Sequence, residues 1–253
     1  MKGYIYQGLG NSFAIIKCNT SFSYKELAIQ LCNKYKLDGL ITYDDNFKMT
    51  IYNKDGSKAL MCGNGIRCLV QHLYKENKKD CYLINTDIGI KKVEVKSINP
   101  FISKVNLGNP RLIKELNEIK KITIDSHDYF FNSLFLDNYH VIIMVDNIDD
   151  EKVINDAEKI FHHPLFKTKC NITFCQIITH NLIKTRTYER GVGFTLSCGT
   201  GSTSAAYISY LLYNLSKTIN VIQPLGTLKV EISSNQIFLE GESEFVKEID
   251  IYD

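Results

Sequence analysis

Several signals that would place a chain in a broad functional class are missing from these 253 residues. No apolar run approaches the ~20 residues that a membrane-spanning helix requires. The first residues lack the apolar core of a secretory signal peptide, so we expect a cytoplasmic protein with no membrane partner. The net charge is only +2 and no basic stripe is present, which gives little support for nucleic-acid binding.

Sequence patterns of common metal, phosphate and redox sites are missing as well. No two cysteines have the Cys-x2-Cys spacing of a structural zinc site, and we expect no metal. The Gly-rich segments lack the context of a P-loop or a dinucleotide-binding fingerprint. Eight cysteines in a long chain without a secretion signal do not indicate a disulfide framework. Most of them have mixed apolar neighbours, which predicts small buried side chains: Cys18, Cys32, Cys68, Cys81, Cys170 and Cys175.

The most informative feature that is present is a duplicated motif. Cys62-Gly63-Asn64-Gly65 and Cys198-Gly199-Thr200-Gly201 lie a little over half the chain apart. Residues 89–95 resemble residues 226–232 at almost the same separation, and residues 11–16 resemble residues 138–143. Three matches in one order predict two copies of a unit of roughly 120 residues. We expect an N-terminal lobe over 1–115, a C-terminal lobe over 116–241, and a final strand within 242–253 that returns to the first lobe.

Short β-branched runs alternate with a few helical periodicities, which predicts an α+β protein. The predicted strands cover residues 13–17, 40–43, 48–52, 81–85, 91–96, 141–145, 173–178 and 228–232. The predicted helices cover residues 23–35, 66–74, 150–161 and 202–215. Ser23 and Glu26 have the spacing of a capping box at the start of the first helix.

Each duplicated cysteine precedes a predicted helix, where unpaired N–H groups and the helix dipole favour a thiolate. The glycines let several N–H groups converge on an anion such as a carboxylate. Two such sites fit the inversion of a hydrogen-bearing stereocentre, because one group must remove a proton and another must return one to the opposite face. Two alternatives remain open at this point: glycine turns that only cap helices, and a redox pair.

Longer ordered motifs carry a family resemblance over nearly the whole chain. They are residues 8–13, 53–57, 62–68, 138–140 and 188–193, together with Asn171 and residues 198–201. In these motifs the chain resembles diaminopimelate epimerase, a cofactor-independent enzyme of the two-cysteine epimerase and racemase superfamily. The resemblance implies two pseudo-symmetric lobes, each a mixed, largely antiparallel sheet wrapped around a central helix, with the active site in the cleft between them. It also implies interconversion of LL- and meso-diaminopimelate in lysine and peptidoglycan precursor synthesis.

The resemblance further implies a role for each matching residue. Cys62 and Cys198 would be the two catalytic bases, and His140 would support them. The carboxylate beside the reacting carbon would be held by Gly63, Asn64, Gly199 and Thr200. The far end of the substrate would be held by Asn11, Asn53, Asn138, Asn171, Glu189 and Arg190. We expect no cofactor, a small-molecule amino-acid substrate, and no nucleic-acid or membrane partner; a homodimer is left open.

Four positions depart from the family pattern. Ser12, Gly39, Tyr139 and Phe194 replace residues that are usually Asp, Gln, Pro and Glu. These departures leave open a racemase for another amino acid, such as histidine or diaminobutyrate. A protein that binds an amino acid without turning it over is a third hypothesis.

Overall fold

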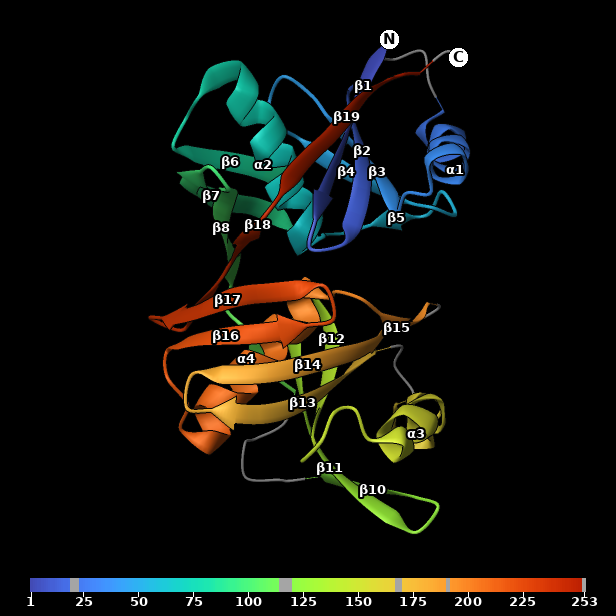
Figure 1. Cartoon of the computed structure of the whole chain (residues 1–253), viewed down its shortest axis with the longest axis vertical. Coiled ribbons are helices and arrows are strands. Elements are labelled where there is room, and N and C mark those ends of the chain that lie inside the picture. Colours follow the sequence, from blue (N-terminus) through green and yellow to red (C-terminus); the bar gives the residue numbers. More distant parts are fainter. Residues whose placement is uncertain (19–22, 114–119, 167–169, 190–191, 252–253) are drawn as a thin grey trace. The chain divides into compact units, whose positions relative to one another are not determined.

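The computed structural model describes residues 1–18, 23–113, 120–166, 170–189 and 192–251. The chain divides into two compact units, Met1–Asn106 with Glu240–Asp253, and Leu107–Leu239. It passes into the second unit within β8 (Phe101–Gly108) and returns within β18 (Gln236–Glu242). The described residues form two mixed sheets and four α-helices, which confirms the predicted α+β class (Figure 1).

The first unit contains a six-stranded sheet in the order β19-β1-β2-β3-β4-β5. Its strands are β1 (Lys2–Gly8), β2 (Asn11–Lys17), β3 (Gly39–Tyr43), β4 (Met49–Asn53), β5 (Lys58–Ala59) and β19 (Glu244–Asp250). Only β2 and β3 are parallel, because α1 (Tyr24–Tyr35) carries the chain back between them. Helix α2 (Gly63–Asn77) follows β5 and leads into the antiparallel strands β6 (Cys81–Thr86), β7 (Gly89–Ile98) and β8.

The two helices of the first unit contact different parts of its sheet. α1 contacts β3 and β4, whereas α2 contacts β1, β2 and β19. All five residues of β3 are buried, so its sequence does not alternate between apolar and polar residues as a half-exposed strand would. Ala14, Ile16 and Leu40 pack with Leu27 and Leu31 of α1 in one core. The predicted C-terminal strand is present as β19, which pairs antiparallel with β1.

The second unit repeats the same order of elements. Its strands are β9 (Arg111–Leu112), β10 (Lys120–Ile124), β11 (His127–Leu136), β12 (Asn138–Met144), β13 (Asn171–Thr179), β14 (Leu182–Glu189), β15 (Gly193–Thr195), β16 (Thr218–Gln223), β17 (Gly226–Ser233) and β18. Its helices are α3 (Glu151–Phe161) and α4 (Gly199–Tyr213), with a 3-10 turn at Pro164–Phe166. The sheet order in this unit is β10-β11-β12-β13-β14-β16-β17-β18.

The correspondence between the units extends to strand direction. β12 and β13 are parallel across α3, as β2 and β3 are across α1. β13 and β14 are antiparallel, as β3 and β4 are, and a short strand then precedes the cysteine helix in each unit. The units differ in extent after that helix, since β16 pairs parallel with β14 over three residues, while a single parallel bridge between Lys48 and Asn85 joins the start of β4 to β6.

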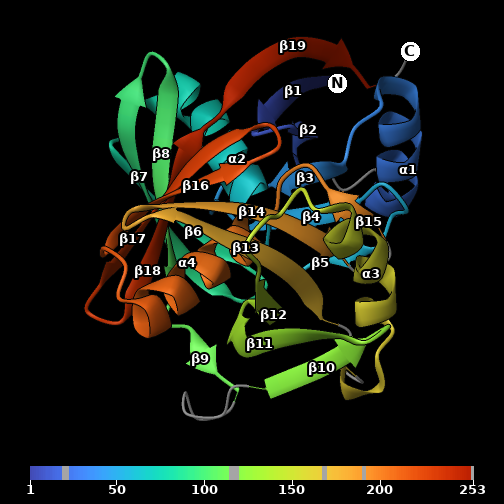
Figure 2. The ribbon, with the colours of Figure 1, turned by 60° about the horizontal axis from the view of Figure 1, so that its bottom comes forward.

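The central helix α4 contacts β11 to β14, β16 and β17, whereas α3 contacts β10, β13 and β14. Figure 2 shows α3 and α4 on different sides of the β13–β14 pair. Val153, Ala157 and Ile160 of α3 pack with Ile172 and Phe174 of β13. Both faces of this sheet are therefore covered, so β12 and β13 carry apolar runs where a half-exposed strand would alternate.

Two local predictions are wrong. Ser23 is the N-cap residue of α1, but its side chain makes no capping hydrogen bond, so the predicted capping box is not formed. Cys18 and Cys81 are exposed, because one follows the end of β2 and the other lies on the outward face of β6. Cys32, Cys68, Cys170 and Cys175 are buried as predicted, and all eight cysteines are free thiols.

Candidate active site

Both duplicated cysteines are N-cap residues of the central helix of their unit, as the sequence predicts. Cys62 precedes α2 with φ −143°, and Cys198 precedes α4 with φ −133°, so both have extended backbone. The Sγ of Cys62 accepts the N–H of Gly65 at 3.3 Å, and the Sγ of Cys198 accepts the N–H of Gly201 at 3.4 Å. Each sulfur therefore occupies the place of a capping oxygen, where a thiolate is favoured by the helix N–H groups.

The third residue of each helix lies very close to the sheet, and glycine fits this position without displacing a neighbour. A Cβ on Gly201 would lie 2.7 Å from Oγ1 of Thr173 and 2.8 Å from Oγ1 of Thr187. A Cβ on Gly65 would lie 3.0 Å from Cδ1 of Ile41. The second glycine of each motif thus has a packing reason, in addition to supplying the N–H that the sulfur accepts.

In the first unit, Asn64 connects the helix start to β2. Its side-chain Nδ2 donates to Oδ1 of Asn11 at 2.6 Å. Its Oδ1 accepts from Nη2 of Arg67 at 2.7 Å, and Nη1 of Arg67 donates to the carbonyl of Gly63 at 2.9 Å. The structure therefore brings Asn11, Gly63 and Asn64 together beside Cys62.

Asn53 is the last residue of β4 and is exposed. Its Nδ2 donates to Oγ of Ser57 at 3.0 Å, which ties the turn that follows the strand. Its strand partner is Gly39, the first residue of β3. Because β2 and β3 are parallel and β4 is antiparallel to them, Asn11, Gly39 and Asn53 share one edge of the sheet.

In the second unit, Cys198 and Glu189 interact electrostatically. Burial raises the pKa of the Cys198 thiol well above its ordinary value, and the negative charge of Glu189 raises it further. The N–H of Gly201 and the hydroxyl of Thr200, 3.9 Å from Sγ, lower that pKa but do not outweigh burial. The expected stabilisation of a thiolate by the helix end is thus present at Cys198 but is smaller than the cost of desolvating the charge.

The remaining predicted residues of this unit lie along the corresponding strand ends. Asn138 begins β12 and is exposed, with its Oδ1 accepting the N–H of Tyr139 at 2.8 Å. Asn171 begins β13, is 7% exposed and pairs with His140 of β12. Glu189 ends β14 and accepts from Oγ1 of Thr195 at 2.7 Å. Arg190 lies outside the described residues.

His140 is completely buried, and neither ring nitrogen has a hydrogen-bond partner within the described structure. Burial lowers its pKa to about 4, so the ring is neutral at physiological pH. A neutral imidazole in this position can donate one hydrogen bond and accept another without carrying charge. No group of three or more metal-ligating side chains occurs among the described residues. No described helix is long and apolar enough to cross a membrane.

Comparison with known families gives a clear assignment. The diaminopimelate epimerase model matches residues 3–113 and 137–246, which include both cysteine motifs. The chain belongs to the diaminopimelate epimerase family. This is a family of isomerases that act on small molecules.

Curated diaminopimelate epimerases are similar to this chain over most of their length. That of Halothermothrix orenii is 33% identical over 94% of this chain and 93% of its own. That of Pelagibacter ubique is 32% identical over 99% of this chain and 98% of its own. That of Clostridium perfringens is 32% identical over 94% of this chain and 95% of its own.

Solved structures show the same fold at low sequence identity. A predicted epimerase from Pseudomonas aeruginosa has a TM-score of 0.75 at 9% identity and covers 100% of this chain and 99% of its own. A hydroxyproline epimerase from Agrobacterium vitis has a TM-score of 0.69 at 11% identity and covers 100% of this chain and 92% of its own. A PhzF-family phenazine biosynthesis protein from Bacillus anthracis has a TM-score of 0.70 at 16% identity, covering 98% of both chains.

The four positions that depart from the diaminopimelate epimerase pattern each make defined local contacts. A Cβ on Gly39 would lie 2.8 Å from the carbonyl oxygen of Tyr52, so the close approach of β4 excludes the usual glutamine. Ser12 donates its N–H and its hydroxyl to Oδ2 of Asp38 at 2.8 and 3.3 Å. Phe194 packs edge-on against Tyr188, and the guanidinium of Arg186 lies 4.5 Å from its ring centre. Tyr139 packs edge-on against Phe135.

Two residues of this site were not singled out from the sequence. Arg67 is completely buried, and its charge between apolar helix neighbours was a usable signal. Gln223, at the end of β16, accepts the N–H of Cys198 with its Oε1 at 2.7 Å. Its Nε2 is buried without a partner among the described residues. A glutamine at a strand end gives no sequence signal for a contact with a cysteine 25 residues earlier in the chain.

Proposed function

We propose that this protein interconverts LL- and meso-diaminopimelate by proton transfer between two cysteines and the α-carbon of the substrate. The observation that carries the proposal is the matched placement of Cys62 and Cys198, each an N-cap whose sulfur accepts a helix N–H. Family membership, and relatives named diaminopimelate epimerase at 30–33% identity, support the same reaction. The product would serve lysine and peptidoglycan precursor synthesis in the cytoplasm.

The reaction requires one thiolate and one thiol on opposite faces of the same carbon. The thiolate removes the α-proton and the thiol returns another proton from the other side, so the configuration inverts. The raised pKa of Cys198 suits the cysteine that begins as the thiol when the substrate arrives. The two roles exchange when the reaction runs in the reverse direction, which is why both groups are cysteines.

The carboxylate beside the reacting carbon would be held by N–H groups of the two helix starts. Gly63 and Asn64 begin α2, and Gly199 and Thr200 begin α4. Such donors stabilise the negative charge that moves toward the carboxylate when the α-proton leaves, so no pyridoxal phosphate or metal is required. His140 is neutral and buried, and its partner on the neighbouring strand is Asn171. It would support the site without adding charge.

The far amino-acid group of the substrate would be bound at the strand ends. Glu189 would accept from the ammonium group and Arg190 would pair with the carboxylate, since guanidinium and carboxylate match in geometry. The four asparagines at Asn11, Asn53, Asn138 and Asn171 would complete this part of the site. A second amino-acid head group in the substrate explains why so many polar side chains occur there.

Isotope exchange tests the reaction directly. In D2O we expect LL-diaminopimelate to gain one deuterium at the inverted α-carbon, detected by mass spectrometry and NMR. Cys62→Ala and Cys198→Ala should each abolish inversion, because either change removes one of the two proton carriers. Cys68→Ala is the matched control, since this thiol is buried in the same helix as Gly63 and lies outside the proposed site. Inversion that persists in either active-site variant would contradict the two-cysteine mechanism.

A racemase for histidine or diaminobutyrate is a second candidate. It is supported by Gly39, which leaves no side chain where the family usually has glutamine, and by Phe194, which packs against aromatic rings where the family usually has Glu. The same exchange experiment with a panel of amino acids separates the two. Deuterium incorporation into one of these amino acids, with none into diaminopimelate, would favour this candidate.

A further inference from the structure

Arg67 is a buried cation without a carboxylate partner. Its side chain is fully buried in α2, and no described carboxylate lies within ion-pair distance of it. Burying an unpaired charge costs several kcal/mol in general, so a chain that keeps one must gain something from the hydrogen bonds that it makes. Two of those bonds go to residues that directly follow Cys62: the carbonyl of Gly63 and Oδ1 of Asn64.

The chemistry of the guanidinium fixes the orientation of the neighbouring amide. Arginine can only donate, so the atom of Asn64 that faces Arg67 must be the oxygen. The Nδ2 of Asn64 then points to Asn11 and must meet an acceptor, which is Oδ1 of Asn11 at 2.6 Å. The second amide is thereby oriented as well, and the atom of Asn11 that remains for a ligand is Nδ2.

We propose that Arg67 is a positioning residue of the substrate site, which acts through Asn64 so that Asn11 presents N–H donors to a carboxylate group of the substrate. The inference rests on the proposed function, because it assigns Asn11 to substrate binding. An asparagine can in principle bind a carboxylate with its nitrogen or an ammonium with its oxygen. The chain from Arg67 through Asn64 to Asn11 selects the first of these.

The corresponding position of α4 shows what this arginine adds. Thr203 stands five residues after Cys198, as Arg67 does after Cys62, and its Oγ1 donates to the carbonyl of Gly199 at 2.7 Å. Both side chains therefore donate to the first carbonyl of their helix. Arg67 alone of the two also holds a side-chain amide, so its role goes beyond closing the first helical turn.

A double-mutant cycle on the intact protein tests the coupling. We expect Asn11→Ala to raise KM for LL-diaminopimelate about tenfold, as the loss of one charge-assisted hydrogen bond does. Arg67→Met should raise KM by a similar factor, because Asn64 and Asn11 are then free to turn. In the Arg67→Met background, Asn11→Ala should raise KM by less than a further factor of about two. Additive effects would overturn the proposal.

A polarity test uses Asn11→Asp, which keeps an acceptor for Asn64 but presents oxygen to the ligand. We expect KM to rise at least tenfold more than in Asn11→Ala, because an acceptor then faces a carboxylate. A lower KM than in the unmodified protein would show that an ammonium group binds there and would overturn the proposal. Thr203→Val is the matched control for loss of the helical carbonyl contact, and its KM should stay within about twofold of the unmodified value.

If Arg67→Met does not fold, Arg67→Lys replaces it, since lysine keeps the charge but lacks the forked donors. The same coupling with Asn11→Ala is then expected, but Arg67→Lys alone should raise KM less than Arg67→Met. Failure of the proposed function has a different signature, because the unmodified protein would then exchange no α-hydrogen of diaminopimelate. Additive variants in an active enzyme contradict only the role of Arg67.

Discussion

Cys198 has a thiol that resists ionisation, although it caps a helix. It is 7% exposed, and Glu189 adds a negative charge to an environment that already disfavours the thiolate. Because only the thiolate reacts with iodoacetamide, we expect alkylation of Cys198 in a Cys62→Ala protein to keep accelerating up to at least about pH 9. The rate is measured by mass spectrometry of the peptide that contains Cys198.

Glu189→Gln tests the cause of this shift. Removing the carboxylate charge should lower the pKa of Cys198 and move the alkylation profile to lower pH. Burial should still keep this pKa above that of a free cysteine. A profile that levels off below pH 8 in the Cys62→Ala protein would contradict the raised pKa. An identical profile after Glu189→Gln would show that Glu189 has no part in it.

Two buried histidines make stability depend on pH. Burial lowers the pKa of His72 and of His140 to about 4, below the ordinary value of 6.5. The unfolded chain therefore binds these protons first as the pH falls, and the stability that neutral histidines contribute is complete above pH 6.5 and is lost toward pH 4. By pH 5 the loss is about 2 kcal/mol for each histidine. Urea unfolding at pH 7 and pH 5 measures it.

His140→Met should remove about half of that pH dependence. The variant should be close to neutral or stabilising at pH 7, because it replaces a ring whose nitrogens have no partner in the described structure with an apolar side chain. The control is His180→Gln, at an exposed position between β13 and β14. This variant should leave the difference in the free energy of unfolding between pH 5 and pH 7 unchanged. An unchanged difference in His140→Met would contradict the lowered pKa.

At the same residue scale, the sequence predicts the two cysteines but not the side chains that hydrogen-bond to the backbone and amide groups around them. Cys62 and Cys198 are visible because their four-residue motifs repeat, and a repeat survives in sequence. Arg67 and Gln223 act through side-chain hydrogen bonds whose geometry depends on how the helix docks on the sheet. The raised pKa of Cys198 has the same origin, since burial depth is a tertiary property.

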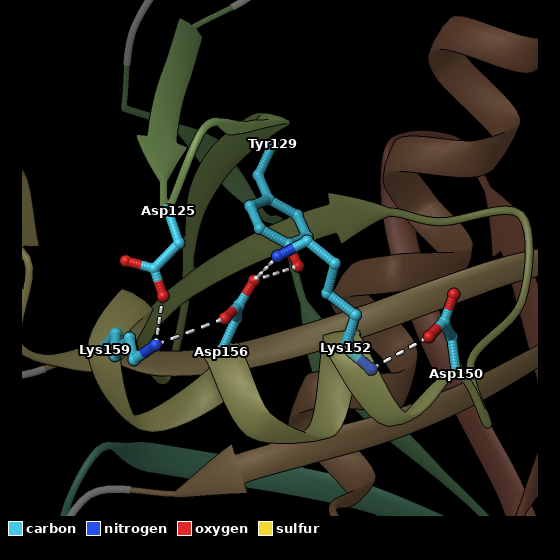
Figure 3. A network of polar contacts seen from close by, with 6 residues as sticks. All are labelled: Asp125, Tyr129, Asp150, Lys152, Asp156 and Lys159. Carbon is cyan, nitrogen blue, oxygen red and sulfur yellow. Dashed lines mark hydrogen bonds and ion pairs between the residues drawn. The ribbon is translucent and has the colours of Figure 1, made fainter.

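At the scale of elements, α3 is fastened to the β10–β11 hairpin by a buried carboxylate. Asp156 is 2% exposed and accepts from the hydroxyl of Tyr129 at 2.8 Å and from Nζ of Lys152 at 2.9 Å (Figure 3). Lys159, 3.8 Å from Asp156, also contacts Asp125 in the turn of the hairpin. Burial alone would raise the pKa of Asp156, but these hydrogen bonds hold it below its ordinary value.

Asp156→Asn should therefore lower the free energy of unfolding by about 1.5–3 kcal/mol, the range for a hydrogen bond to a charged group. The matched control is Asp128→Asn, in strand β11 of the hairpin that Asp156 contacts. Asp128 also accepts from a lysine and a hydroxyl, Lys121 and Thr123, but it is exposed, so we expect a loss below about 1 kcal/mol. Equal losses in urea unfolding would show that burial does not strengthen the network around Asp156.

All four helices and eight strands predicted from the sequence are present, with ends that shift by a few residues. α2 begins at Gly63 and not at Ile66, because the cysteine motif itself forms the first turn. The strands that were missed include β8, in which buried and half-buried residues alternate, and β11, whose pattern is irregular. β1 pairs with β2 in a local hairpin, whereas its pairing with β19 joins the two ends of the chain and depends on tertiary contacts.

At the scale of the whole molecule, the duplication explains most of the architecture. β1 to β8 with α1 and α2 repeat as β11 to β18 with α3 and α4, with the same strand directions up to the central helix. The assignment of lobes and the cleft between them stay predictions. In sheet order β19 lies beside β1 as β10 lies beside β11, and both pairs are antiparallel. β10 directly precedes its partner in the chain, whereas β19 comes from the C-terminal end and adds a strand to the first unit.

The last strand should therefore stabilise the first unit specifically. Ile249 of β19 is 6% exposed and packs with Ile5, Ala14 and Ile16, so Ile249→Ala should cost about 2–5 kcal/mol. Val246 lies on the same strand but is 48% exposed, and Val246→Ala should cost less than about 1 kcal/mol. Hydrogen exchange locates the effect: in Ile249→Ala the amides of β1 should lose protection while those of β13 keep theirs. Equal loss in both strands would mean that the two units unfold as one cooperative body, and unchanged protection in β1 would contradict the role of β19.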